Sequence, residues 1–132
     1  RIWFDQNPSR IFDRASRYTD VVSKYSGISG IGRRPDITVA VEDEAGPERR
    51  ILLEVKRTRG GEYQRDAVYK GFGYLYDFQA IWSGLPQQTP KIAVLYPGAT
   101  EPRSATAWLG DELVCVSTSS PDQLDEVMAQ VE

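Results

Sequence analysis

Two acidic residues and a lysine occur at a spacing that suits hydrolytic chemistry. Asp36 is followed, after seventeen intervening residues, by Glu54, and Lys56 comes two positions later. Carboxylate oxygens are the ligands that Mg²⁺ and Mn²⁺ prefer, and a lysine ammonium can stabilise negative charge that grows on a phosphate. These three residues therefore predict a metal-dependent hydrolytic site, provided that the fold brings them together.

The segments that carry these residues have the patterns of two β-strands. Residues 36–42 alternate between polar and apolar side chains, which is typical of a half-buried strand. Residues 50–56 are more apolar and are expected to lie centrally in a sheet. The cluster of turn-forming residues at 43–47 predicts that the two strands pair as an antiparallel hairpin.

The register of this hairpin decides whether the acidic residues meet. With the turn centred near Ala45, matching the apolar faces sets Asp36 opposite Glu54 and leaves Lys56 on the same face. Two carboxylates about 5 Å apart repel each other unless a positive charge lies between them. A divalent cation would remove that conflict.

The remaining segments complete an alternating order of elements. Helices are predicted over residues 9–25 and 63–82, strands over 91–96 and 112–117, and a closing helix over 121–131. The order is helix, strand, strand, helix, strand, strand, helix. It predicts a mixed α/β domain in which helices flank a central sheet.

The predicted second helix contains residues that its apolar face does not explain. Gly71 and Gly73 disfavour a helix interior, so we expect both to allow close packing against the sheet. The apolar stripe of this helix is formed by Ala67, Gly71, Tyr74, Leu75, Phe78 and Trp82. Tyr69 and Tyr76 fall on the far side of the helix from this stripe. We expect these two rings to cover a contact with another domain or with a second copy in a homodimer.

The length of the chain fits a single domain over residues 1–132, which we expect to be a piece of a longer polypeptide because it opens with Arg1 instead of Met. No apolar run reaches the roughly 18 residues that a membrane span requires, and no membrane partner is expected. The single cysteine, Cys115, excludes an intrachain disulfide and fits a reducing cytoplasm.

The composition restricts the chemistry further. The absence of histidine excludes Ser-His-Asp triads, Cys-His pairs and His-rich zinc sites. A net charge of −3 and a pI near 5.1 do not match a dedicated nucleic-acid binder with a basic surface. The basic residues nevertheless comprise twelve Arg and four Lys. Arg favours bidentate contacts with phosphate and also forms structural salt bridges, so the excess fits either role.

The motif formed by Pro35-Asp36 and, after seventeen intervening residues, Glu54-Val55-Lys56 resembles the signature of the PD-(D/E)xK superfamily. This superfamily includes restriction endonucleases, Holliday-junction resolvases and repair nucleases. Together with the order of elements, the resemblance extends over roughly residues 9–117. It implies a restriction endonuclease-like core and Mg²⁺- or Mn²⁺-dependent cleavage of DNA, within a restriction, defence or repair protein. It also implies that Asp36, Glu54 and the Val55 carbonyl bind the metal, and that Lys56 assists the attacking water.

The same resemblance suggests further site residues. The helix after the hairpin often carries a Gln, Lys or Tyr that approaches the site, and here the candidates are Lys70 and Gln64. A helix pair between Asp66 and Lys70 is the competing interpretation for Lys70. Five arginines near the motif are candidates for holding the nucleic-acid backbone, or else form a solvated charged edge: Arg33, Arg34, Arg57, Arg59 and Arg65.

One departure from the superfamily keeps a second function open. Many members add a metal-binding Glu from the first helix, and the helix predicted here has none. Its acidic residues, Asp13 and Asp20, lie opposite its apolar face and are expected to be solvated, so the number of metal ions stays open. The alternative function is a catalytically inactive nuclease-like fold used for protein association or nucleic-acid positioning. A small-molecule hydrolase is disfavoured, because the chain has neither a Gly-rich phosphate loop nor a nucleophile with a partner base.

Overall fold

A mixed sheet forms the centre of the protein. The computed structural model describes residues 1–25, 27–28, 32–56, 61–87, 91–96, 106–109 and 112–117. Within them, six strands pair in the order β1-β2-β3-β4-β6-β5. Their bounds are β1 Ile2–Phe4, β2 Ile37–Asp43, β3 Gly46–Val55, β4 Ile92–Tyr96, β5 Thr106–Leu109 and β6 Leu113–Ser117. The predicted α/β class with a mixed central sheet is confirmed.

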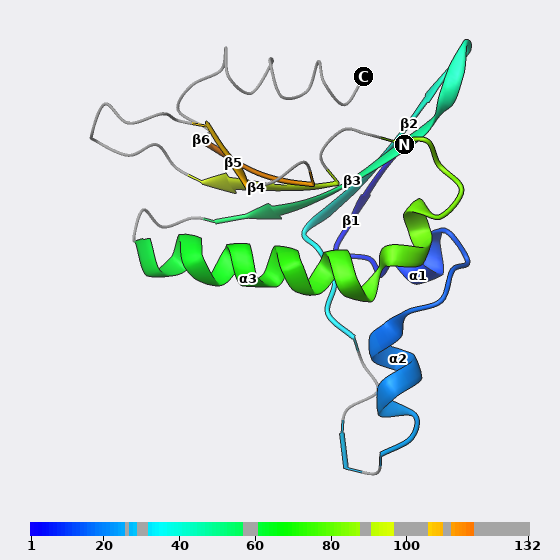
Figure 1. Ribbon diagram of the computed structural model, residues 1–132, viewed down its shortest axis with the longest axis vertical. Helices are drawn as coiled ribbons and strands as arrows, with labels where there is room; N and C mark the ends of the chain where they lie inside the picture. Colours follow the sequence, from blue (N-terminus) through cyan, green and yellow to red (C-terminus); the bar gives the residue numbers. More distant parts are fainter. Residues whose placement is uncertain are drawn as a thin grey trace.

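Strands β2 and β3 form the predicted hairpin in the predicted register. Ile37 pairs with Leu53 and Val39 with Ile51, in an antiparallel ladder that shifts by a bulge near the turn. The turn end of this hairpin projects beyond the other strands, and from there β3 runs back alongside β4 (Figure 1). The central position of β3, between β2 and β4, is also as predicted.

The prediction that β2 is half-buried is wrong. Thr38 and Ala40, on the face expected to be polar, are as fully buried as Val39 on the other face. Helix α3 (Gly61–Asp77) runs along this face of the sheet and packs mainly on β4 (Figure 1). The alternation of polar and apolar side chains in β2 therefore does not mean that only one of its faces is buried.

Helix α3 connects β3 to β4, and these two strands pair in parallel. Such a connection needs a crossover, and a helix packed on the sheet is its usual form. The apolar stripe predicted for this helix is confirmed, with Ala67, Tyr74 and Phe78 buried against Leu52 of β3. The predicted helix over 63–82 ends in a separate 3-10 turn, η1 (Gln79–Trp82), which buries Trp82 in the same core.

The two glycines of α3 have different environments. A Cβ at Gly71 would lie 2.5 Å from Leu113 Cδ1 and 3.3 Å from Ile92 Cγ2, so the predicted close packing holds there. At Gly73 the prediction is wrong, because a Cβ would meet no atom within 4 Å. Gly73 thus weakens the helix by about 1 kcal/mol relative to Ala without a packing reason.

The predicted helix over 9–25 is two short helices, α1 (Pro8–Ile11) and α2 (Arg17–Val22). Asn7 caps α1, because its side-chain oxygen accepts a hydrogen bond from the Ser9 amide. Asp13 has a left-handed backbone (φ 49°), which stops the first helix. Ser16 then starts the second helix by accepting a hydrogen bond from the Thr19 amide.

Some elements lie outside what the sequence indicated. The short strands β1 and β5 were not predicted, and the predicted helix over 121–131 lies outside the described residues.

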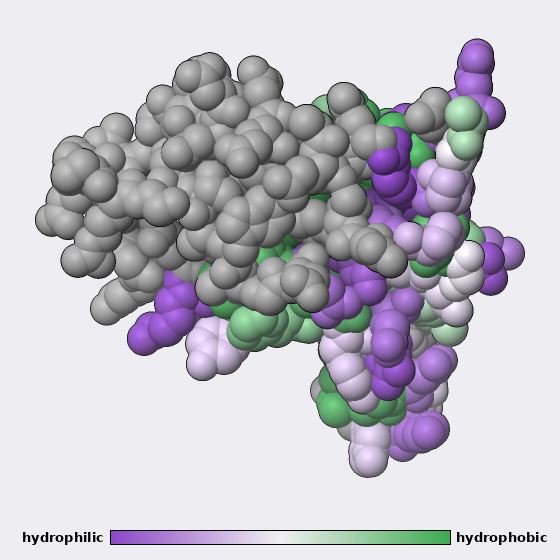
Figure 2. All heavy atoms as spheres, turned by 45° about the horizontal axis from the view of Figure 1, so that its top comes forward, coloured by the Kyte–Doolittle hydropathy of each residue, from purple (hydrophilic) through white to green (hydrophobic). Residues whose placement is uncertain are grey.

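Over the described part of the face in Figure 2, hydrophilic and hydrophobic residues are intermixed. None of the helices in the described segments has the length and apolar character to cross a bilayer.

Candidate active site

Glu54 is a buried carboxylate at the end of β3, only 2% exposed. Its Oε1 accepts hydrogen bonds from Lys70 Nζ, in a close contact, and from Lys56 Nζ at 3.5 Å. Its Oε2 accepts one from the Tyr74 hydroxyl at 3.2 Å. Removing a charge from water costs free energy unless the charge is paired and hydrogen-bonded. The two lysines pair with Glu54, and all three donors form hydrogen bonds with it. The cluster therefore gives the buried Glu54 carboxylate three hydrogen-bond donors inside the fold.

Two elements position this cluster. Lys56 follows Glu54 by two residues, so both side chains point to the same face of the strand. Lys70 and Tyr74 are one helical turn apart on α3, which lies on that face. Asp66, the competing partner for Lys70, instead contacts Arg65 at 3.9 Å on the exposed side of the helix. Lys70 thus reaches the site, as the resemblance implied.

Asp36 lies at the same end of the hairpin. It is exposed and forms a bend just before β2, so the strand ladder starts one residue later, at Ile37. Its Oδ2 accepts a hydrogen bond from the Val55 amide at 2.7 Å. Because Val55 is adjacent to Glu54, this bond fixes the Asp36 carboxylate beside the end of β3.

Tyr74 is the site residue that the sequence analysis missed. Its hydroxyl lies 3.2 Å from Glu54 Oε2 and 3.3 Å from the Arg34 carbonyl oxygen, so it connects the cluster to the segment before Asp36. Burial first, and then the charges of Glu54 and Asp36, raise the pKa of Tyr74 well above its usual value. The phenol therefore stays protonated and acts as a donor. Its spacing of four residues from Lys70 was the available signal, but its place in the apolar stripe concealed it.

A groove with a volume of about 1030 Å³ opens over this cluster, and we call it the α3 groove. Lys56, Lys70 and Tyr74 line it together with residues of α2 and Arg33. Glu54 lies beneath these side chains. A ligand in the groove would therefore meet the lysine ammonium groups first.

The donor set fits a magnesium-type cation. Among the described residues there is no group of three or more His, Cys, Asp or Glu side chains that could form a closed metal site. Mg²⁺ does not require one, because it usually keeps several waters and binds through one or two carboxylates plus substrate phosphate. Asp36, Glu54 and the Val55 carbonyl are oxygen donors of this kind at one end of the hairpin.

The five arginines expected to form one basic rim are not all brought together. Arg33 lines the α3 groove, whereas the neighbouring Arg34 points to another cavity and contacts Asp5 at 3.5 Å. Arg65 is exposed beside Asp66. Arg57 and Arg59 lie outside the described residues, and the side chain of Gln64 is not described either.

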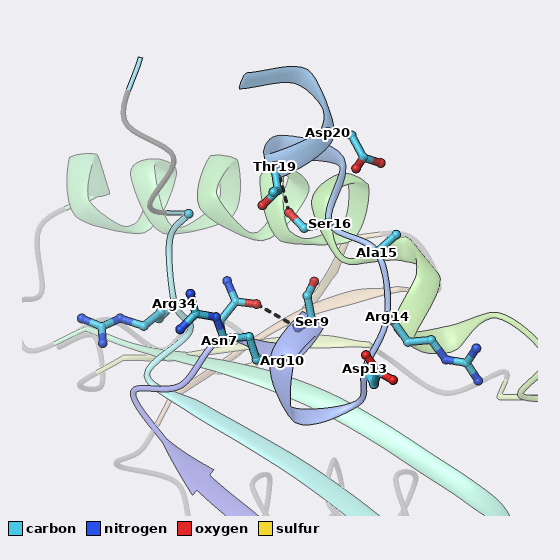
Figure 3. A pocket seen from close by; sticks show the side chains of 11 residues that line it. Asn7, Ser9, Arg10, Asp13, Arg14, Ala15, Ser16, Thr19, Asp20 and Arg34 are labelled. Atoms are coloured by element: carbon cyan, nitrogen blue, oxygen red, sulfur yellow. Dashed lines mark hydrogen bonds between the residues drawn. The ribbon is translucent and has the colours of Figure 1, made fainter. Parts of the chain in front are cut away.

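That other cavity, of about 710 Å³, lies between α1, α2 and the segment before β2. Asp13 and Asp20 line it with Arg10 and Arg14 (Figure 3). Both acidic residues are exposed, as predicted, and neither lines the α3 groove. They do not replace the glutamate that the superfamily often takes from its first helix.

Comparison with known proteins adds no relative to this description. No family model matches the chain, and no match was found among curated proteins or solved structures. The function is therefore inferred from the chemistry of the residues around Glu54.

Proposed function

We propose that the protein is a metal-dependent nuclease of the PD-(D/E)xK type that hydrolyses DNA phosphodiester bonds, built on a restriction endonuclease-like core. The observation that carries this proposal is the buried Glu54, which meets two lysines beneath an open groove beside Asp36. Stability alone does not explain a buried ionic cluster, because apolar side chains would fill the same space without the free-energy cost of removing charges from water. Its position under a groove supports a chemical role.

Each residue of the cluster has a role in this proposal. Asp36, Glu54 and the Val55 carbonyl would hold a Mg²⁺ or Mn²⁺ ion. When bound, the cation supplies Lewis-acid stabilisation of the negative charge on the reacting phosphate. Tyr74 keeps Glu54 oriented through its hydroxyl.

The two lysines are not equivalent. Lys70 makes the closer contact with Glu54, whereas Lys56 Nζ is 3.5 Å away, at the limit of a hydrogen bond. We assign Lys56 to the attacking water and the developing phosphate charge. Its hydrogen bond to Glu54 is the weaker of the two, so turning toward a substrate breaks a weaker interaction. Lys70 stays paired with Glu54 and contacts phosphate from the helix side.

One observation favours the alternative, a catalytically inactive nuclease-like fold that associates with proteins or positions nucleic acid. Both Glu54 oxygens already accept hydrogen bonds from Lys56, Lys70 and Tyr74, so the carboxylate has its hydrogen-bond partners without a metal ion. Such a cluster would bind Mn²⁺ no better than an unrelated acidic protein does.

Cleavage assays with matched variants test the proposal. The protein is incubated with supercoiled, linear duplex and single-stranded DNA, with and without Mn²⁺. The control is Asp36→Asn, which keeps an oxygen acceptor for the Val55 amide and removes the charge. We expect Mn²⁺-dependent cleavage of at least one form by the wild type, and a loss of at least about 10²-fold in Asp36→Asn. Metal-independent cleavage, or equal cleavage by both proteins, would refute the proposed site.

A further inference from the structure

Exposed aromatic rings line the α3 groove next to the proposed site. Tyr69 and Tyr76 are 67% and 64% exposed, and both line the groove on the same side as Lys70. Residues three or four apart share one face of a helix, so Tyr69, Gly73 and Tyr76 form a continuous stripe along α3. The rings therefore lie along the path of a ligand that reaches the lysines.

Gly73 leaves the middle of this stripe open. A Cβ at this position would meet no atom within 4 Å, so no neighbouring element requires a glycine there. Glycine is nevertheless among the least favourable residues for a helix interior. A ligand that lies across the stripe explains this choice, because any side chain at position 73 would project into the α3 groove.

The charges around the rings suit a polyanion. The Arg17 guanidinium lies over the Tyr76 ring at 4.5 Å from its centroid, and Arg33 lines the groove without an ion pair to the described residues. Of the two acidic residues in the groove, Asp66 contacts Arg65. The other, Asp77, accepts hydrogen bonds from the Ser16 hydroxyl and the Tyr18 amide. Cations thus remain beside the rings to contact phosphates.

We infer that the α3 groove binds single-stranded nucleic acid, with bases stacked on Tyr69 and Tyr76 and the backbone passing over Gly73 toward Lys70. Stacking on aromatic side chains, beside cations that follow the backbone, is the usual means of binding a single strand. Bases inside a duplex are stacked on each other and cannot use these rings. This inference rests on the proposed function and narrows its substrate to single strands or unpaired ends.

Binding measured without metal tests the groove separately from catalysis. The probe is a fluorescein-labelled single-stranded thymidine 20-mer in EDTA, with a blunt 20-base-pair duplex for comparison. We expect Tyr69→Ala and Gly73→Leu to weaken binding of the single strand by about tenfold, and Tyr69→Phe to retain it because the ring remains. Tyr25→Ala is the matched control, because Tyr25 is 60% exposed and does not line the groove. It should change binding by less than about twofold.

Thermal melting of the same variants shows whether they fold. Gly73→Leu should melt at the same or a higher temperature, because Leu favours a helix, so weaker binding would not come from unfolding. Equal affinity for duplex and single strand, unchanged in Tyr69→Ala, would overturn the inference. It would also be overturned if Tyr69→Ala abolished self-association of the protein and left binding of the 20-mer unchanged, because a second copy would then cover the rings.

Cleavage in Mn²⁺ is measured in parallel, so the two proposals fail separately. Loss of single-strand binding in Tyr69→Ala, in a protein that cleaves nothing, supports the groove and refutes the nuclease. Cleavage of duplex and single-stranded DNA at equal rates, unaffected by Tyr69→Ala, supports the nuclease and overturns the groove.

Discussion

At the scale of single residues, the balance of charge around Glu54 governs both stability and chemistry. Lys70 and Lys56 share one oxygen of this carboxylate, and Tyr74 holds the other. Either lysine alone would keep the carboxylate paired. The site can therefore release one ammonium toward a substrate without leaving a buried charge uncompensated.

Substitution of Lys56 should separate catalysis from stability. In Lys56→Ala, Lys70 still neutralises Glu54, so we expect the free energy of unfolding to change by less than about 1 kcal/mol. We expect the cleavage rate to fall by about 10² to 10³, the usual effect of removing one group that stabilises developing charge. Single-turnover cleavage and urea unfolding measure the two effects. A Lys56→Ala protein that cleaves at the wild-type rate would contradict the role given to this lysine.

The double variant is the control for this interpretation. Replacing Lys56 and Lys70 together by Ala leaves Glu54 buried without a cation, which should destabilise the fold by about 3 to 5 kcal/mol. A loss equal to the sum of two small single effects would mean that the lysines do not share the carboxylate.

Tyr74 should make stability depend on alkaline pH. Its pKa is raised in the folded state, so its proton favours folding at all pH values below about 10, and this contribution is lost as the pH rises above about 10. Compared with Tyr74→Phe, the wild type should therefore lose up to about 1.4 kcal/mol per pH unit above pH 10. Urea unfolding of both proteins between pH 8 and 11 measures this difference. A constant difference over that range would show that the phenol is not held protonated.

At the scale of elements, the hairpin and α3 were predictable because the spacing of their apolar residues fits only one arrangement of secondary structure. The apolar faces match only when Val39 lies opposite Ile51, and a shift by one residue would turn the apolar side chains of one strand to the opposite face of the sheet. The break between α1 and α2 was not predictable, because the left-handed Asp13 and the Ser16 cap are local choices within a segment of continuous helical spacing. Strand β1, with three residues, is too short for periodicity to reveal.

The candidate site was predictable in part. The motif located Asp36, Glu54 and Lys56 at one end of the hairpin, because strand alternation fixes which side chains share a face. It did not reveal that Glu54 is buried, since that depends on α3 packing over it. Tyr74 was assigned to the core alone, because apolar spacing does not tell which hydroxyl meets a carboxylate.

The two glycines of α3 should respond in opposite directions to the same substitution. Gly73→Ala should raise the free energy of unfolding by about 1 kcal/mol, because the helix gains and nothing is displaced. Gly71→Ala should lower it by about 1 to 3 kcal/mol, because Leu113 and Ile92 must move in a packed core. Urea denaturation of the two variants measures both. Equal effects would contradict the packing described for this helix.

At the scale of the whole molecule, the net charge of −3 limits attraction to nucleic acid. The cations that would contact a substrate in the α3 groove are Arg17, Arg33, Lys56 and Lys70. Few phosphate contacts mean a shallow dependence of binding on salt. Recognition would then depend on the groove and on a cation held beside it.

Mn²⁺ binding, followed by the loss of the free-ion signal in electron paramagnetic resonance, tests most directly whether Asp36 and Glu54 together hold a cation. We expect one saturable site in the wild type, weakened by at least about tenfold in Asp36→Asn, which preserves the Val55 hydrogen bond. Asp20→Asn, an exposed acidic residue outside the α3 groove, should bind Mn²⁺ as the wild type does. Equal, weak binding by all three proteins would contradict the metal-dependent site.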